Sequence, residues 1–283
     1  MTELENRPSI KETIIITKEN LPIWRQEIAN LREIPRKERE TLNLIRPVLK
    51  GADRLGERKD VVELYWEKYL IGKHLAMAAR DKSGLWDLPL KALGIGKGYL
   101  LMKDSAYKAE KYINKHQVEN CRPRSGRFLG EIAIFEKRYD KAISHFQKSI
   151  NLFNQIDDWS QRVNSLEISG FLAESLILSG QTEEGIDIIK NKFKAYNEGD
   201  GVKLKENDYY TWAVWKSGLL TKGWHAILAK KVLLDENNKK LMINLLNSAE
   251  KILVIPEGQK TWGDKNFEIR KNEIKAIKKS IGI

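Results

Sequence analysis

The 283-residue chain has one cysteine and only 4 histidines, so few of its residues are suited to binding a metal. A single cysteine excludes an intrachain disulfide and a cysteine-rich zinc site, and it is typical of proteins from a reducing compartment. The histidines lie far apart and form no HExxH-type pair. The sequence therefore predicts no metal site and no cofactor.

Long apolar runs are also missing. No window approaches the ~20 consecutive apolar residues that span a bilayer, and the start of the chain lacks the basic and apolar segments of a signal peptide. We therefore expect a cytoplasmic protein without a membrane span. The hydrophobic share of 41%, with 8 tryptophans, is still sufficient for a folded core.

Proline and glycine are scarce, at 7 and 19 residues, whereas Lys, Glu, Leu, Ile and Ala are abundant, which favours helix over sheet. Residues 128–153 show two apolar-periodic segments around a short polar turn at Lys137 to Asp140. Gly130 and Ala133 permit the close approach of a second helix. So short a turn predicts an antiparallel helical hairpin.

This hairpin resembles the tetratricopeptide repeat (TPR) family, whose 34-residue unit is a pair of helices. The matching positions are Leu129, Gly130, Tyr139, Ala142, Ile143, Phe146 and Ser149. Lys137 stands where the family usually has a glycine before the turn, and Asn154 where it usually has a proline. A second, similar unit has its glycine at Gly180 and follows at a longer spacing than the family period.

The resemblance implies an all-α fold, a right-handed α-superhelix (α-solenoid) of antiparallel helix pairs. Residues 1–20 are expected to form a flexible N-terminal arm, and residues 21–283 a single TPR-like helical repeat domain. The best repeats are expected at 123–156 and 163–197, and a capping helix at 262–281. Stacked hairpins bury the apolar faces that a lone hairpin would leave in water.

Two glycine-containing stretches interrupt this pattern. Glu198 to Gly201 predicts a loop. Gly94, Gly96 and Gly98 lack the spacing of a phosphate-binding loop, so they predict a close helix contact or a helix break.

Residues that could take part in catalysis also have structural explanations. Asp157 and Asp158 are adjacent, and neighbouring residues of a helix do not face each other, so capping and solvation explain them better than acid–base catalysis. Arg122 and Arg124 are basic neighbours of Cys121 and would lower the pKa of an exposed thiol. With no positioned histidine, we expect a buried, unreactive cysteine.

The aromatic residues Trp212, Trp215 and Trp224 fall within an apolar helical pattern. We expect them to build a core, with stacking on exposed bases as the alternative.

The resemblance also implies a binding site, because helix-A residues line the concave groove of the family. By position these residues are Arg124, Arg127, Glu131 and Ile134. Arginines in such a groove pair with carboxylates of a bound peptide. The alternative is that they are solvated or bonded to a neighbouring repeat.

The formal net charge of +11 suggests an acidic partner or reflects composition alone. The candidate polyanion contacts lie in the capping helix and are Arg270, Lys271, Lys275, Lys278 and Lys279. The alternative is a solvated basic surface.

The function implied is a non-catalytic protein–protein interaction scaffold or adaptor that binds a partner protein or peptide in its concave groove. No constellation of catalytic residues indicates an enzyme. A basic helical-repeat protein that associates with RNA or a ribonucleoprotein is the first alternative, and a peptide-sensing regulatory module is the second. The identity of the partner and the oligomeric state are left open.

Overall fold

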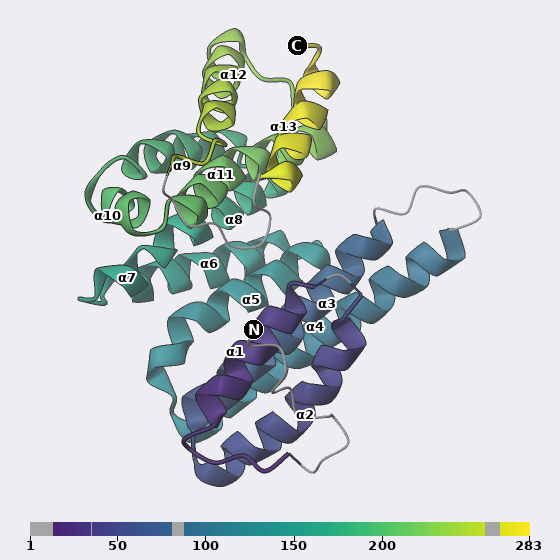
Figure 1. The fold of residues 1–283 in the computed structure, drawn as a ribbon. Coiled ribbons are helices and arrows are strands. Elements are labelled where there is room, and N and C mark those ends of the chain that lie inside the picture. Colours follow the sequence, from purple (N-terminus) through teal and green to yellow (C-terminus); the bar gives the residue numbers. More distant parts are fainter. Residues whose placement is uncertain (1–13, 35, 81–87, 258–266) are drawn as a thin grey trace. The chain divides into compact units, whose positions relative to one another are not determined.

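The computed structural model describes residues 14–34, 36–80, 88–257 and 267–283, and the regular structure within these ranges is entirely helical (Figure 1). The predicted all-α class is confirmed. The chain divides into two compact units, residues 1–125 and 126–283. We describe each unit by itself, and the single continuous superhelix expected over 21–283 stays a prediction.

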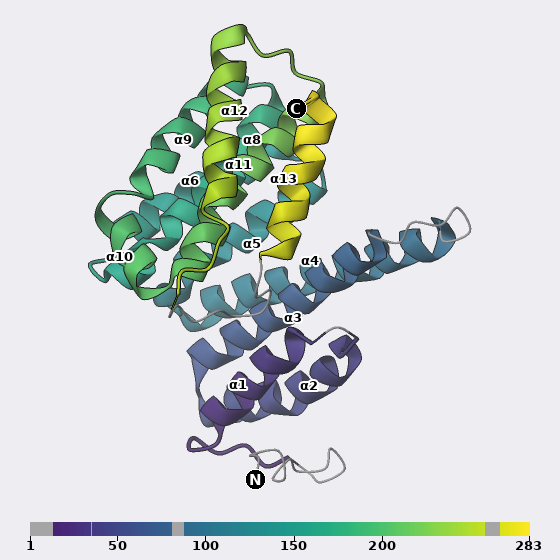
Figure 2. The ribbon, with the colours of Figure 1, turned by 45° about the horizontal axis from the view of Figure 1, so that its top comes forward.

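The first unit is built on a long helical hairpin, α3 and α4, against which two shorter helices pack (Figure 2). Its elements are α1 (Leu21–Arg32), α2 (Glu38–Leu55), α3 (Arg58–Arg80), α4 (Leu88–His116) and a 3-10 turn, η2 (Glu119–Cys121). Ile16, within the segment expected to be a flexible arm, is 5% exposed and fills the space beside Gly51. Of that expected arm, residues 1–13 lie outside the described part.

Small residues allow α3 and α4 to pack closely. A Cβ atom at Gly98 would lie 2.5 Å from the carbonyl oxygen of Gly72, and one at Gly94 would lie 2.6 Å from the Cβ of Ala79. The predicted close contact is thus confirmed at both positions. The alternative of a helix break is wrong, because α4 runs through all three glycines without interruption.

The second unit stacks helical hairpins around α8, which packs against α6, α9 and α11. Its elements are α5 (Arg122–Phe135), of which the first residues belong to the first unit, α6 (Tyr139–Asn154), α7 (Trp159–Arg162), α8 (Asn164–Ser179), α9 (Thr182–Ala195), α10 (Gly199–Asn207), α11 (Tyr209–Lys230), α12 (Glu236–Lys251) and α13 (Glu268–Ile281). Helix α8 is buried on nearly all sides, and its buried positions are mostly apolar or small, as expected of a helix enclosed by others.

Helices α5 and α6 form the predicted hairpin. Ala142 is fully buried, and a Cβ atom at Gly130 would lie 2.4 Å from the Phe146 ring, so the glycine makes room for that ring. At the turn Lys137 adopts a left-handed conformation (φ 57°), and the Arg138 amide donates to the Ala133 carbonyl at 2.8 Å.

The α8–α9 hairpin repeats this turn. Gly180 is left-handed (φ 100°), and the Gln181 amide donates to the Leu176 carbonyl at 2.8 Å. Both turns thus close with the amide of the residue after the left-handed one donating back into the preceding helix. Lys137 adopts the same conformation as the glycine, at the conformational cost that a side chain pays in this region.

The prediction of a loop at Glu198 to Gly201 is wrong, because α10 begins at Gly199. A Cβ atom at Gly201 would lie 2.5 Å from the Ala195 carbonyl oxygen, so this glycine permits α10 to approach the end of α9. The expected capping helix coincides in part with α13, and residues 258–266 lie outside the described part.

Candidate functional site

The four residues predicted to line a groove differ in their surroundings. Arg124 belongs to the first unit and is exposed, with its guanidinium carbon 5.3 Å from the centre of the Trp66 ring. In the second unit Arg127 and Glu131 are largely buried and Ile134 is half-buried. The row is therefore not uniformly open to a ligand.

Arg127 joins α5 to α8 through carboxylates. Its Nη2 lies 2.9 Å from Oε1 of Glu167 and its Nε lies 3.2 Å from Oε1 of Glu131. The three side chains are 8–14% exposed, and the guanidinium also packs over the rings of Phe128 and Phe171. For Arg127 the alternative explanation, a bond to a neighbouring repeat, matches these contacts. Removal of one member of such an enclosed group is destabilising, because the opposite charge is left buried without compensation.

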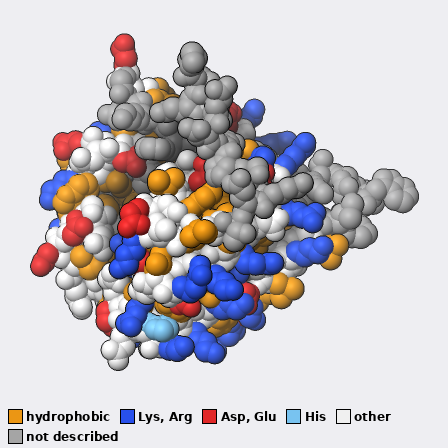
Figure 3. Space-filling view, turned by 60° about the horizontal axis from the view of Figure 1, so that its bottom comes forward, with side chains coloured by type: hydrophobic (Ala, Val, Ile, Leu, Met, Phe, Trp, Pro, Cys, Tyr) orange, Lys and Arg blue, Asp and Glu red, His pale blue; other side chains and the backbone are white. Residues whose placement is uncertain are grey.

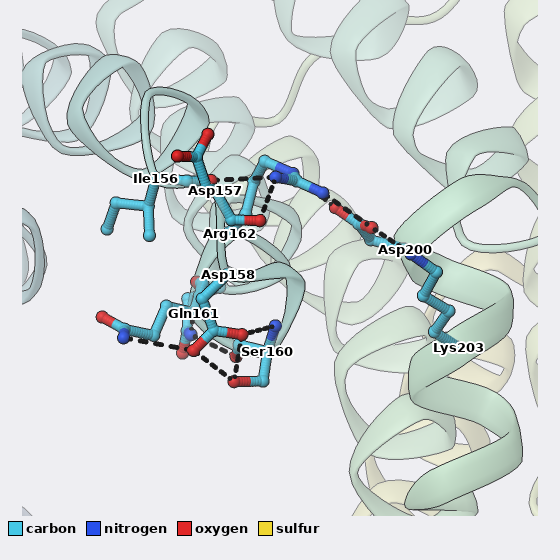
Figure 4. A network of polar contacts seen from close by, with 9 residues as sticks. Ile156, Asp157, Asp158, Ser160, Gln161, Arg162, Asp200 and Lys203 are labelled. Carbon is cyan, nitrogen blue, oxygen red and sulfur yellow. Dashed lines mark hydrogen bonds and ion pairs between the residues drawn. The ribbon is translucent and has the colours of Figure 1, made fainter.

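Asp158 caps a short helix, and Arg162 links the same turn to Asp200 (Figure 4). Asp158 accepts hydrogen bonds from the amide and hydroxyl of Ser160, and these bonds lower the pKa of the carboxyl group. Arg162 forms two hydrogen bonds to Asp200, at 2.7 and 3.1 Å, and a third to the Asp157 carbonyl. The predicted capping role is confirmed for Asp158, whose lowered pKa keeps it ionised and unsuited to act as an acid.

The buried cysteine and the tryptophan core are both confirmed. Cys121 is 2% exposed, and burial raises the pKa of its thiol to about 11, so it is not a reactive thiolate. Trp212 and Trp224 are 2% and 3% exposed, whereas Trp215 is half-buried. The Trp212 indole donates to the Tyr196 carbonyl at 2.8 Å, which satisfies its polar atom within the core.

Lys216 is a buried lysine that the sequence pattern did not identify. Its side chain lies in an aromatic recess, with Nζ 4.5 Å from the centre of the Phe193 ring and 4.7 Å from that of Trp212, and it donates to Asn197 Oδ1 at 2.7 Å. Burial, and secondarily Lys205, lowers the pKa of Lys216 to about 8. Because the residue is 4% exposed, its environment indicates a structural role.

Two of the five basic residues predicted on α13 are held by neighbours. Arg270 donates to the Thr221 hydroxyl at 2.6 Å and pairs with Glu273. Lys278 pairs with Glu250 of α12 at 2.6 Å, so it joins the two helices. These contacts leave neither side chain fully available to a ligand.

The other three, Lys271, Lys275 and Lys279, are exposed. Their spacing of four residues places them along one side of α13. Within the described ranges of the chain, no carboxylate lies within ion-pair distance of their amino groups. They therefore form an open cationic edge, which we call the α13 lysine edge.

This edge borders an open groove of about 690 Å³ between α13 and the end of α12. Val254 and Ile283, which are 65% and 55% exposed, contribute its apolar surface, and the buried Leu253 lies behind them in its wall. Helical spacing in the sequence predicts the lysines of this site but none of its apolar residues. Val254 and Ile283 lie beyond the ends of their helices, where helical periodicity gives no signal.

Positive charge is not confined to this groove. Figure 3 shows one face of the molecule, where Lys and Arg side chains gather mainly in the lower half of the view. The groove differs from such a surface because its cations border exposed apolar side chains.

Among the described residues, no group of three or more His, Cys, Asp or Glu side chains is placed to hold a metal ion. No helix in the described ranges combines the length and apolarity that crossing a membrane requires. Comparison with protein-family models and with curated proteins finds no match.

Proposed function

We propose that the protein is a non-catalytic scaffold or adaptor that binds an acidic segment of a partner protein in the groove between α12 and α13. The observation that supports this proposal most directly is the meeting of the α13 lysine edge with the exposed apolar side chains of Val254 and Ile283. Cations alone attract many anions, whereas this combination selects a ligand with both carboxylates and apolar groups.

The geometry sets the size of the ligand. Lys271 and Lys279 are eight residues apart, or about 12 Å along the helix axis. A segment of two to three helical turns, or a shorter extended one, spans that distance. Its carboxylates would face the α13 lysine edge while its apolar side chains cover Val254 and Ile283.

The concave groove predicted from the repeat resemblance remains a further proposal. Arg127 and Glu131 already pair with each other and with Glu167, so a partner there would contact chiefly the exposed Arg124 or the half-buried Ile134. The α12–α13 groove is the better supported site because its lysines are accessible and its apolar side chains are not covered.

RNA association is the alternative that the charge of +11 favours. Binding to a phosphate backbone uses the cations of the groove but leaves the apolar residues without a role. The apolar surface of the groove therefore favours a protein segment. Peptide sensing, the second alternative, would use the same kind of ligand with a downstream response.

A direct test compares three labelled probes: a peptide of three helical turns with glutamates every four residues and leucines between them, its glutamine analogue, and a single-stranded oligouridylate. Fluorescence anisotropy is measured with the full chain at low and moderate salt. We expect the acidic peptide to bind most tightly. Preference for the oligouridylate, with a steep loss of affinity in added salt, would replace this proposal with RNA association.

Variants locate the binding site. Exposed ion pairs contribute about 0.2–1 kcal/mol each, so K271Q/K275Q/K279Q should weaken peptide binding roughly ten-fold. Val254→Asp should also weaken it, because it places a carboxylate where apolar contact is expected. The matched control K190Q/K194Q/K239Q removes three other exposed lysines of the second unit and should bind like the wild type. Equal losses in both triple variants would show that only net charge matters.

A further inference from the structure

The outer side of α4, in the first unit, carries an exposed apolar row. Leu93, Leu100 and Tyr107 are 54%, 63% and 44% exposed. They are seven residues apart, about two helical turns, so they lie along the same side of the helix. The opposite side, with Met102, Ala106, Ala109 and Ile113, is buried.

Gly96 lies on the exposed side, between Leu93 and Leu100. Unlike Gly94 and Gly98, it makes room for no neighbour, since a Cβ atom there would meet nothing within 4 Å. A glycine in an exposed helix interior costs about 1 kcal/mol relative to alanine. Its position within the apolar row would allow another helix to approach closely.

The charges beside this row are self-complementary. Lys97 and Asp104 are both exposed, and each follows a leucine of the row by four residues. If a second α4 lies antiparallel with the two copies of Leu100 facing each other, Lys97 of each copy comes opposite Asp104 of the other. A two-fold axis repeats the contact, so the arrangement closes as a dimer. Lys108 pairs with Asp104 at 2.9 Å within the helix and would flank this contact.

We propose that this surface binds a second copy of the same chain through an antiparallel α4–α4 contact centred on Leu100. Leu93 of each copy packs against Tyr107 of the other, and the Lys97–Asp104 pairs fix the orientation. The row is short, so the interface belongs among weak ones, which bury less than about 1,200 Å². The contact is independent of the α12–α13 groove and does not require the proposed function.

Sedimentation velocity of the full chain, from about 1 µM to about 1 mM, covers the range of weak association. We expect a concentration-dependent monomer–dimer equilibrium. Leu100→Lys should abolish the dimer, since two lysines would meet at the two-fold axis. Leu233→Lys is the matched control, because Leu233 is 97% exposed in the second unit and its replacement should leave dimerisation unchanged.

Charge exchange tests the antiparallel geometry. Lys97→Glu and Asp104→Lys should each weaken dimerisation several-fold, because residues 97 and 104 then carry the same charge at both of the symmetry-related contacts. The double variant K97E/D104K should restore dimerisation. A wild-type chain that stays monomeric throughout would overturn the proposal. So would a dimer that tolerates Leu100→Lys, or a double variant weaker than both single variants. Circular dichroism should show the same helix content in every variant, since all these side chains are exposed.

Discussion

Cations inside and outside the second unit differ in what surrounds their charge. Arg127 lies between two carboxylates, and Lys216 has an amide acceptor and two aromatic rings. Lys271, Lys275 and Lys279 face solvent beside an open groove. The interior cations are engaged by neighbouring side chains, whereas those outside remain available for binding.

This difference limits what net charge says about function. The value of +11 counts Arg127 and Lys216 equally with the α13 lysines, although they contribute differently to the accessible surface. A buried cation is tolerated only where a partner compensates for lost hydration. The charge available to an acidic ligand is therefore set by local environment.

The largest effect is expected when a cation is placed in the core at a position where no side chain compensates for its lost hydration. Ala142 is fully buried between helices, so Ala142→Arg should destabilise the protein by about 4 kcal/mol or prevent folding. Urea denaturation measures the change. Ser144→Arg, on the exposed side of the same helix, is the control and should unfold like the wild type. If Ala142→Arg also did so, Ala142 would not be in the helix interface.

The next largest effect comes from removing an interior cation. Arg127→Ala leaves Glu131 and Glu167 buried without that guanidinium, so we expect a loss of about 3 kcal/mol in the free energy of unfolding. Adding Glu167→Gln to Arg127→Ala should recover part of it in a double-mutant cycle. Additive losses would mean that the Arg127–Glu167 pair is not coupled.

The α5–α6 hairpin shows what sequence patterns can predict. Periodicity correctly placed Ala142 and Phe146 in the interior and Gly130 at the close contact, because all three follow from spacing along a helix. The pairing of Arg127 with Glu167 could not be predicted from the sequence, because the two residues are 40 positions apart and lie on different helices. A charged residue on a predicted helix gives no sign of whether a distant carboxylate will meet it.

A glycine in the sequence did not show whether it marks a turn or a close contact between helices. Gly180 has the left-handed conformation expected before a turn, whereas Gly201 belongs to a helix and provides a close contact. The predicted loop at 198–201 failed because glycine serves both purposes, and the distinction depends on a neighbouring helix. Only the lysines of the α12–α13 groove were predicted from the sequence, because they follow helical spacing. Val254 was not predicted, because it lies beyond the end of its helix.

Lys216 permits a titration test of the interior. Its pKa of about 8 lies below the usual value near 10.4, so between these values the unfolded chain binds more protons than the folded one. The contribution of Lys216 should therefore make the protein more stable as pH rises through this range, by roughly 2 kcal/mol. Urea midpoints of wild type and Lys216→Met at pH values from about 7 to about 10 isolate this term. A difference independent of pH would mean that Lys216 is not desolvated.

The smallest effects belong to the exterior cations. K271Q/K275Q/K279Q should change the free energy of unfolding by less than about 0.5 kcal/mol, because exposed side chains away from structural contacts contribute little. The single variants sharpen this expectation. Lys279 lies in the last turn of α13, where a cation interacts favourably with the helix dipole, so Lys279→Gln should cost a few tenths of a kcal/mol at low salt.

Lys271 lies near the start of the same helix, where the dipole disfavours a cation, so Lys271→Gln should be neutral or slightly stabilising. Thermal unfolding at low and moderate ionic strength would measure both variants, and salt should remove their difference. A large loss from either variant would show that the lysine belongs with Arg127 and Lys216 as a structural cation. That lysine would then no longer count as part of the α13 lysine edge.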